Sequence, residues 1–307
     1  MKIGIISDIH SNIIAFKAVT DKLASIGCDE YFLLGDFVSD TPYTRETLDY
    51  LYEWIDKHPC YLLRGNREEY MLGQRKAERE NGEDKWIWNS ASGNLLFAYT
   101  QLTDQDLDFF ERLPITFTYT KPGYPSITCC HGSPVNTREL LQLDGKNTKE
   151  WLNKIDTDYL ICAHTHLPGG RSVNGKNYFN PGCVGISIHD AGFAQCMFLE
   201  DGYEAGKKMW KPTFLKVPYD NHQVVHDICV GGLLEKAPWF INSNILTLLT
   251  GVDVSAELVR LARSLAEEAG EEVVWPHIQE KYFEEAAEKL GIPDYRKEHI
   301  LNEEIGG

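Results

Sequence analysis

Basic residues are scarce in this chain of 307 residues. It has 30 Lys and Arg against 46 Asp and Glu, which gives a formal net charge of −16 at pH 7. Proteins that track along a nucleic-acid backbone neutralise its phosphates with Lys and Arg, so we expect no nucleic-acid polymer as a partner. No apolar run approaches the roughly 20 residues of a membrane-spanning helix, and no signal-like segment opens the chain. We therefore expect a cytoplasmic protein without a membrane partner.

Paired cysteine spacing is also missing. No two cysteines stand in a C-x-x-C arrangement, and several lie inside apolar runs that are typical of buried strands. The eight are Cys28, Cys60, Cys129, Cys130, Cys162, Cys183, Cys196 and Cys229. This pattern favours small, reduced core residues over a disulfide framework.

Five short polar motifs stand where apolar, strand-like runs end. The runs cover residues 3–7, 31–34, 60–64, 126–130 and 159–163, and the motifs that follow them are Asp8-Ile9-His10, Gly35-Asp36, Gly65-Asn66, His131-Gly132 and His164-Thr165-His166. Groups just past the carboxyl ends of parallel strands converge on one crevice of an α/β sheet. These side chains would serve two metal ions about 3.5–4 Å apart if one carboxylate is shared. A mixed carboxylate, imidazole and amide set suits Mn²⁺, Fe or Zn²⁺ better than Mg²⁺ or Ca²⁺.

The order of these motifs resembles the signature of the calcineurin-like metallophosphoesterases, which reads D-x-H, G-D, G-N-H-[DE], H-G and G-H-T-H. Within that family the chain looks closest to the small bacterial phosphodiesterase branch. The segments that carry this likeness are His131-Gly132-Ser133-Pro134, His164-Thr165-His166-Leu167-Pro168 and Asn180-Pro181-Gly182-Cys183-Val184-Gly185. The resemblance implies an α/β catalytic domain over residues 1–218, with two packed mixed β-sheets flanked by helices.

The resemblance also implies a role for each polar residue. One metal ion would be held by Asp8, His10, Asp36 and His166, and the other by Asp36, Asn66, His131 and His164, so that Asp36 bridges them. A hydroxide between the ions would attack phosphorus. The catalytic group would be Asp36, Asn66, Arg67 and His131, and the contacts to the substrate phosphate would be Asn12 and Arg67.

Arg67 departs from the family pattern, which usually has His after the Gly-Asn pair. An arginine has a pKa above about 12 and cannot act as a general acid near neutral pH. Its planar fork of donors can instead clamp phosphate oxygens. The alternative is a solvated helix residue paired with Glu68 or Glu69. Ala163 and Cys183 replace the family's usual Gly and Ser, and we expect them to alter packing only.

Helical and turn signals outline the rest of residues 1–218. We expect helices from about Ser11 or Asn12 to Gly27, from 44 to 58, after Asn66, and around 107–113. An insertion at 76–92 contains Trp86 and Trp88, which either anchor it to the core or stack on a nucleobase. Strands dominate after Pro114 and form a second, mixed sheet. The hairpin turns are expected at Lys121-Pro122-Gly123, Asn174-Gly175 and Asp201-Gly202.

Residues 219–307 read as a helical C-terminal extension. Apolar residues repeat there at helical spacing, for example Leu258, Leu261 and Leu265, with Glu residues on the opposite faces. Three roles stay open at this point. The extension could cover the substrate cleft, build the interface of a homo-oligomer, or cap the sheet.

These features together favour a dinuclear metal-dependent phosphoesterase that hydrolyses a phosphodiester or phosphoanhydride. The expected partner is a small phosphorylated substrate, with nucleotides and dinucleoside polyphosphates among the candidates. A phosphomonoesterase or protein phosphatase is the alternative within the same chemistry. A non-catalytic interaction scaffold on the same fold is the alternative of another class.

Overall fold

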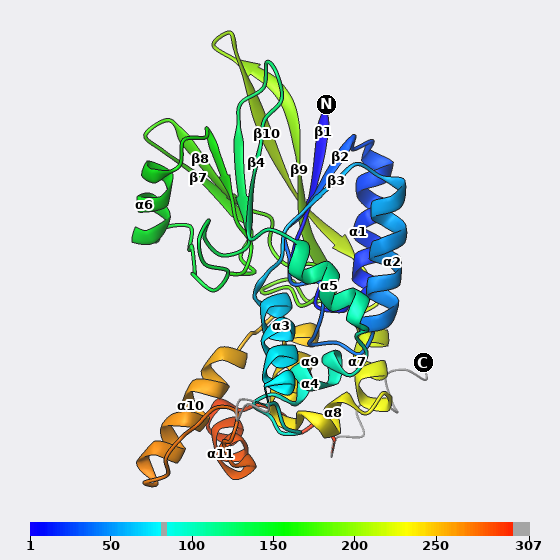
Figure 1. Ribbon diagram of the computed structural model, residues 1–307, viewed down its shortest axis with the longest axis vertical. Coiled ribbons are helices and arrows are strands. Elements are labelled where there is room, and N and C mark those ends of the chain that lie inside the picture. The colour runs from blue at the N-terminus through cyan, green and yellow to red at the C-terminus, as the bar shows by residue number, and fades with distance from the viewer. Residues whose placement is uncertain (81–84, 297–307) are drawn as a thin grey trace.

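The computed structural model describes residues 1–80 and 85–296, which form two five-stranded sheets and eleven helices (Figure 1). The strands are β1 (Lys2–Ile6), β2 (Glu30–Leu33), β3 (Cys60–Leu62), β4 (Thr116–Tyr119), β5 (Ile127–Cys130), β6 (Tyr159–Ile161), β7 (Gly169–Val173), β8 (Lys176–Asn180), β9 (Phe193–Glu204) and β10 (Lys207–Pro218). The helices are α1 (Ile13–Ile26), α2 (Thr44–Lys57), α3 (Asn66–Arg79), α4 (Gly93–Tyr99), α5 (Asp104–Arg112), α6 (Lys146–Lys154), α7 (Asn221–Val230), α8 (Leu233–Lys236), α9 (Pro238–Thr250), α10 (Ser255–Glu268) and α11 (Glu280–Leu290).

Both sheets are mixed, as the sequence predicts. The first has the order β10-β9-β1-β2-β3, with β1, β2 and β3 parallel and β9 antiparallel to β1. The second has the order β4-β5-β6-β8-β7, with β5, β6 and β8 parallel and the two edge strands antiparallel. The prediction that all strands after Pro114 form the second sheet is wrong for β9 and β10. These strands join the first sheet because Leu199 of β9 pairs with Ile3 of β1.

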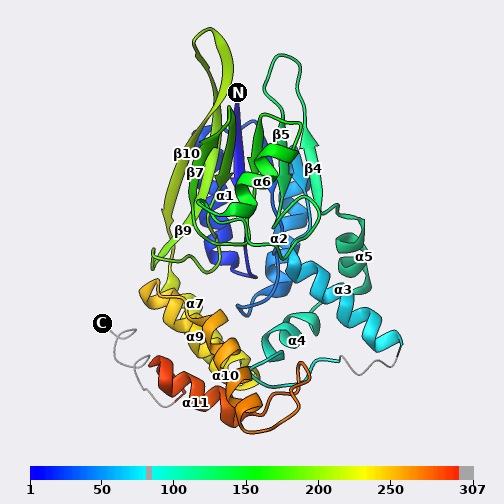
Figure 2. The same cartoon turned by 90° about the vertical axis from the view of Figure 1, so that its left-hand side faces the viewer.

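The sheets pack face to face and helices cover their outer faces. Buried apolar side chains of both sheets, such as Ile5, Phe32, Ile127 and Ile161, fill the space between them. Helices α1 and α2 cover the first sheet, and α6 covers the second (Figures 1 and 2). The architecture is therefore an α/β sandwich of four layers with its main core between the sheets.

Local signals set both ends of α1, whereas one predicted turn is displaced. Asn12 caps α1 by accepting the N–H of Ala15 at 3.0 Å, and Gly27 ends the helix with φ at +77°. The turn predicted at Asp201-Gly202 is wrong, because β9 continues to Glu204. The chain turns at Ala205-Gly206 instead, where both residues have positive φ, as a tight hairpin requires.

The insertion predicted at 76–92 is shorter than expected. Residues 76–79 form the last turn of α3, and residues 81–84 lie outside the described part of the chain. Residues 85–92 run as a loop into α4. Trp86 in this loop packs edge-to-face on Tyr99, with ring centroids 6.1 Å apart, so at least this tryptophan anchors the loop to the core.

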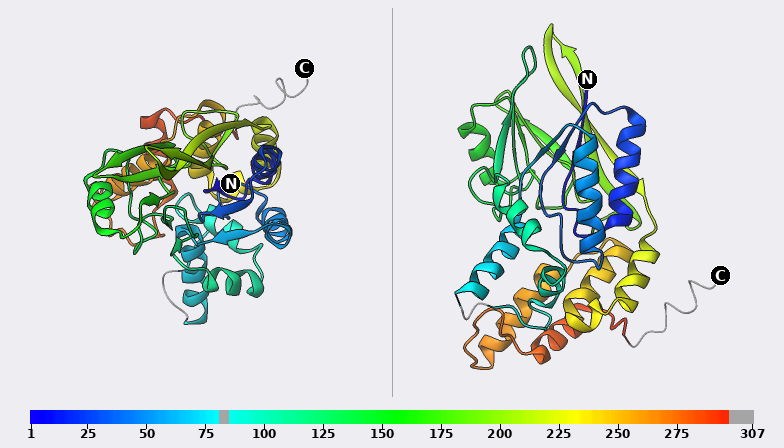
Figure 3. Two further views of the ribbon diagram at one scale, coloured as in Figure 1. Left: turned by 90° about the horizontal axis from the view of Figure 1, so that it is seen from above. Right: turned by 45° about the vertical axis from the view of Figure 1, so that its right-hand side comes forward.

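The last strand ends at Pro218, and the described residues after it form helices and loops. Residues 297–307 of the predicted range lie outside the described part. Helices α7 to α11 lie with α3 and α4 beyond one end of the sheets (Figures 1 and 3). This is the carboxyl end of β1, β2 and β3. Among the described helices, none is long and apolar enough to cross a membrane.

Candidate metal centre

Six of the predicted ligands lie in the loops that follow β1, β2, β5 and β6, and the seventh, Asn66, is the first residue of α3, close after β3. Five of them, Asp8, His10, Asp36, His164 and His166, hold a left-handed backbone conformation that non-glycine residues rarely adopt, and so does the neighbouring Asp40. The φ angles of all six lie between 49° and 72°. Each such residue costs about 1–3 kcal/mol and persists only where the surrounding structure imposes it. Their concentration in one place marks it as a functional site.

The seven predicted ligands come together at this point. One group consists of Asp8, His10 and Asp36, and another of Asp36, His131 and His164, with the ligand atoms of each group within 4.8 Å of one another. Asp36 belongs to both groups, as a bridging carboxylate would. Asn66 and His166 also reach the cluster, since Asn66 Oδ1 lies 3.0 Å from His131 Nε2 and His166 Nε2 lies 3.1 Å from His10 Nε2.

The Oδ1 atom of Asp8 lies at the centre of this cluster. It is buried, and in the described part of the chain it has no hydrogen-bond partner. Three imidazole nitrogens face it, with His166 Nε2 at 3.3 Å and the Nε2 atoms of His10 and His131 at 3.9 Å each. A buried carboxylate oxygen without a donor is costly unless a cation compensates it. The donor set and this oxygen therefore fit a bound divalent cation.

In its neutral form, the ring of His131 has one tautomer. Its Nδ1 lies 2.7 Å from the carbonyl oxygen of Leu34, which can only accept, so Nδ1 carries the proton. Nε2 then points at the cluster, 3.4 Å from Asp36 Oδ1. An imidazole that donates one N–H to a carbonyl and offers the other nitrogen is the usual arrangement of a metal-binding histidine.

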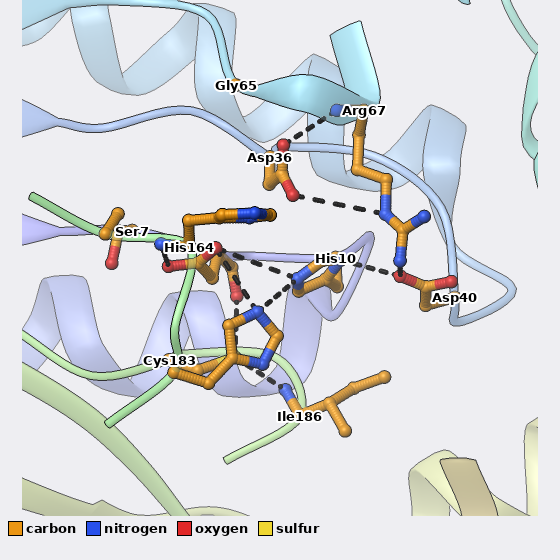
Figure 4. Close-up of polar contacts among 12 residues, drawn as sticks. Ser7, His10, Asp36, Asp40, Gly65, Arg67, His164, Cys183 and Ile186 are labelled. Atoms are coloured by element: carbon orange, nitrogen blue, oxygen red, sulfur yellow. Dashed lines mark hydrogen bonds and ion pairs between the residues drawn. The ribbon is translucent and has the colours of Figure 1, made fainter. Parts of the chain in front are cut away.

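Asp40 orients a second histidine, a role that the sequence did not predict. Its Oδ2 lies 2.8 Å from His10 Nδ1, and Oδ1 accepts from Asn94 Nδ2 at 2.6 Å. Figure 4 shows this carboxylate between His10 and Arg67. The signal in the sequence was a second Asp four residues after Asp36 in a loop, a spacing that by itself gives no direction for the side chain.

Glu68 holds the loop that carries Asp36, and the sequence did not predict this role either. Its buried carboxylate accepts the backbone N–H groups of Asp36, Phe37 and Gly65 at 2.7–2.9 Å. Burial and the nearby charge of Asp36 raise the pKa of Glu68 to about 7, against the opposing effect of the three donors. Glu68 thus fixes the position of Asp36 through the backbone.

Arg67 does not pair with Glu68 or Glu69, so the alternative of a solvated helix residue is wrong. Its Nη2 lies 2.8 Å from Asp40 Oδ2, and its Nε lies 4.0 Å from Asp36 Oδ2. In the described part of the chain, Nη1 makes no hydrogen bond or ion pair, and the side chain lines a cavity beside the cluster. The guanidinium is therefore held in place with one donor group available to a ligand.

Asn12 is not placed to contact a substrate. It is fully buried, its Oδ1 caps α1, and its Nδ2 donates to the carbonyl of Gly185 at 2.8 Å. Both polar ends of the side chain are used within the protein, so we withdraw the phosphate contact expected for Asn12.

Cys183 lies nearer the site than the sequence suggested. Its sulfur belongs to a group with His10 and His166. The thiol donates to the carbonyl of Asp8 and accepts from Ile186, each at 3.2 Å. These two hydrogen bonds engage the sulfur within the protein, which gives Cys183 a supporting role, and burial raises the pKa of its thiol.

The histidines of the cluster differ in their electrostatics. Burial disfavours the charged form of His131, but the neighbouring Asp36 and Asp8 outweigh it and raise its pKa to about 9. Burial and the charge of His131 lower the pKa of His164 to about 4, so His164 is neutral at pH 7. A neutral imidazole has a free lone pair for a metal ion.

A family model described as calcineurin-like phosphoesterase matches residues 1–184, more than half of the chain. The chain belongs to the calcineurin-like phosphoesterase family. All five strand-end motifs of the metal centre fall within the matched residues. The ligand roles of the individual side chains remain predictions, which the geometry above supports.

Proteins similar to this chain match it over most of their own length. An uncharacterised protein of Methanocaldococcus jannaschii is 25% identical over 236 residues, which is 71% of this chain and 88% of the relative. A hypothetical protein of Pyrococcus horikoshii has a similar crystal structure, with a TM-score of 0.66, 19% identity, and coverage of 82% of this chain and 99% of that one. A metallophosphoesterase of Sphaerobacter thermophilus matches with a TM-score of 0.60, 22% identity, and coverage of 82% and 100%.

Proposed function

We propose that this protein is a hydrolase that uses two divalent metal ions to cleave a phosphodiester or a phosphoanhydride. The observation that carries the proposal is the pair of ligand groups that share Asp36, together with the buried Oδ1 of Asp8, which faces three imidazole nitrogens without a hydrogen bond in the described part of the chain. Bound metal ions would supply an activated water and neutralise charge on the phosphate oxygens.

The protein's own residues divide the remaining work. Asp8, His10, Asp36 and His166 would hold one ion, and Asp36, Asn66, His131 and His164 the other. The imidazole-rich set favours Mn²⁺, Fe or Zn²⁺ over Mg²⁺ and Ca²⁺, which bind mainly oxygen ligands. Asp40 and Glu68 would keep the ligands in place, as carboxylates around metal-binding histidines do.

Arg67 would grip a phosphate oxygen through its available Nη1. It keeps its proton near neutral pH and cannot serve the leaving group as an acid. A leaving group that departs unassisted, such as an aryl oxide or a nucleotide phosphate, is therefore favoured over a simple alkoxide. The presence of Arg67 in place of a general acid supports hydrolysis of a diester or an anhydride over hydrolysis of alkyl phosphomonoesters.

A non-catalytic scaffold on the same fold is the competing proposal of another class. Such a protein has no need for a complete donor set, for strained ligand residues or for a carboxylate oxygen buried without a donor. The presence of all three features supports the enzyme.

The test combines metal analysis with turnover. Purified protein loaded with Mn²⁺ is analysed for metal content and assayed on bis(p-nitrophenyl) phosphate and p-nitrophenyl phosphate. We expect two ions per chain, with faster turnover of the diester. Asp36→Asn and His131→Ala should each reduce kcat by more than about tenfold, which corresponds to ~1.4 kcal/mol.

Asp21→Asn, an exposed change on α1, is the matched control. It should leave the metal content and kcat unchanged. A fully metal-loaded Asp36→Asn variant that keeps wild-type kcat would contradict the two-metal mechanism. Wild-type protein that binds two ions and hydrolyses neither ester would favour the scaffold.

A further inference from the structure

A cavity of about 550 Å³ opens beside the metal centre. Three residues of the site form its inner end: Asn66, Arg67 and His164. Its size falls within the range of roughly 300–1,000 Å³ that small-molecule sites occupy. A phosphate at the metal centre would therefore have room beside it for the rest of a small substrate.

The extension forms a large part of the cavity wall. Phe240, Ser255, Val259 and Trp275 come from the extension, whereas Tyr70, Trp86 and Leu95 come from residues 1–218. Of the three roles left open by the sequence, the structure thus favours coverage of the cleft. A smaller cavity nearby also joins Arg67 and His166 to Phe240 and Asn244 of α9.

Large aromatic side chains dominate this wall. Tyr70, Trp86, Phe240 and Trp275 all line the cavity, and Trp275 is 43% exposed. Flat aromatic walls are suited to stacking on a planar ring.

The charged side chains that line the cavity are arginines, one of which, Arg67, is paired with Asp40. Among the described residues that line it, two are arginines, Arg67 and Arg138, and none is acidic, in a protein of net charge −16. The guanidinium of Arg138 lies 4.6 Å from the centre of the Tyr70 ring, and the described residues place no carboxylate in an ion pair with it. The cavity thus combines aromatic surface with positive charge.

Hydrogen bonds hold the two halves of the wall together. Asn89 Nδ2 donates to the carbonyl of Pro276 at 2.9 Å, next to Trp275, and the N–H of Ser90 donates to Glu280 at 3.0 Å. The N–H of Trp86 donates to Gln74 of α3 at 3.1 Å. Because these contacts fix both tryptophan-bearing loops, the aromatic groups are positioned before a ligand arrives.

We propose that this cavity, termed the base pocket, binds the nucleoside part of a nucleotide diester or anhydride whose phosphate lies at Asn66, Arg67 and His164. The proposal rests on the phosphoesterase function above and adds the substrate class and its specificity residues. In the reaction, the oxygen of water bonds to phosphorus and the bond from phosphorus to the other substituent breaks. One proton of the water ends on that leaving oxygen, and the other belongs to the new phosphate monoester. The nucleotide product remains in the base pocket until it dissociates.

The experiment compares two phosphate monoesters that differ in the base alone. Adenosine 5′-monophosphate and ribose 5-phosphate are titrated by calorimetry into the full-length protein, both as loaded with Mn²⁺ and in EDTA. We expect the nucleotide to bind about tenfold or more tightly than the sugar phosphate, since stacking of one base is worth ~1–3 kcal/mol. Trp275→Ala and Tyr70→Ala should each remove most of this difference while leaving affinity for ribose 5-phosphate unchanged.

Trp88→Ala is the matched control. Trp88 is 47% exposed and lies in the same loop as Trp86, but it packs under Lys236 and does not line the cavity. It should bind both ligands as the wild type does. Equal affinity of the wild type for the two ligands would overturn the base pocket, as would a nucleotide preference that survives both cavity variants.

The two proposals fail in different ways. Nucleotide-selective binding by a protein that hydrolyses no ester would overturn the enzymatic function and leave the pocket in place. Turnover of aryl diesters, with equal affinity for the nucleotide and the sugar phosphate, would overturn the proposed base pocket. The proposed enzymatic function would then stand.

Discussion

His10 Nδ1 lies 2.8 Å from Asp40 Oδ2, and the same oxygen lies 2.8 Å from Arg67 Nη2. One buried carboxylate thus positions both a predicted metal ligand and the predicted phosphate clamp. Burial alone would raise the pKa of Asp40, but Arg67 and His10 outweigh it and hold that pKa well below its usual range. Asp40 therefore stays charged, as this double role requires.

Loss of the Asp40 charge should weaken metal binding. In Asp40→Asn the imidazole of His10 loses its ionic partner, and such changes around a metal ligand typically cost about 10–100-fold in metal affinity or activity. The affinity is measured by competition with a chromophoric chelator for Mn²⁺ or Zn²⁺. The exposed variant Asp21→Asn serves as the reference, and an Asp40→Asn protein with reference affinity would rule out the positioning role.

Arg67 should affect turnover and leave metal binding intact. Arg67→Ala removes the phosphate clamp and should raise KM, lower kcat, or both, for aryl diesters. Arg67→His introduces a group that can donate a proton, which is worth roughly 10²–10⁴-fold for a poor leaving group. We expect it to improve hydrolysis of alkyl relative to aryl phosphates. Steady-state kinetics on matched aryl and alkyl esters measure both effects. Values of kcat and KM that are unaltered in both variants would show that Arg67 contacts no substrate.

Gly93 tests the contact between the core and the extension. A Cβ atom at this first residue of α4 would lie 1.9 Å from the carbonyl oxygen of Lys236. Gly93→Ala must therefore move α8 away, and we expect a loss of about 1–3 kcal/mol of unfolding free energy, typical of overpacking. Gly73→Ala within α3 is the control, because a Cβ there meets nothing within 4 Å.

The control should stabilise the protein by about 0.5–1 kcal/mol, since alanine is the better helix residue. Urea unfolding followed by circular dichroism gives both values. Equal stability of the two variants would mean that the extension does not press on α4.

Asp106 should make stability depend on acidity. Burial would raise its pKa, but hydrogen bonds from Arg45, Tyr52 and Thr103, each at 2.7 Å, outweigh it and lower that pKa. A lowered pKa in the folded state adds stability that is fully present above the unfolded value of about 3.9 and is lost as pH falls through the folded value. Asp106→Asn should cost ~1–3 kcal/mol near pH 7, as for other groups left unpaired.

The difference in unfolding free energy between the wild type and Asp106→Asn should shrink as the pH falls below about 4. Urea unfolding at neutral and acid pH measures it. A difference that stays constant over this range would show that the charge of Asp106 makes no contribution.

The sequence was sufficient for features that depend on neighbours along the chain. Apolar runs that end in Asp8-Ile9-His10 or His164-Thr165-His166 predict strand ends, and parallel strands of one sheet bring such ends together. Asn12 and Gly27 mark the ends of α1 through their own backbone preferences. The gathering of these polar residues at one end of the strands could therefore be predicted from the sequence, and the resemblance to the calcineurin-like family supplied the two packed sheets.

Contacts between distant segments needed the tertiary structure. Asp201-Gly202 has the composition of a turn, yet pairing along β9 and β10 carries the strand past it to Ala205-Gly206. Asp40 gives no sign in the sequence of its reach to His10, because the direction of a loop side chain depends on the left-handed backbone around it.

The extension shows most clearly which features the sequence predicts and which depend on the tertiary structure. Helical periodicity predicts its helices, since each apolar face needs only residues three and four apart. Where those helices pack is decided by contacts such as that of Ser90 with Glu280, 190 residues apart, and these place Trp275 beside the metal centre. The sequence by itself thus determined the chemistry at the ends of the strands, and tertiary packing decided what surrounds it, because packing free energy comes from surfaces that meet only in the folded chain.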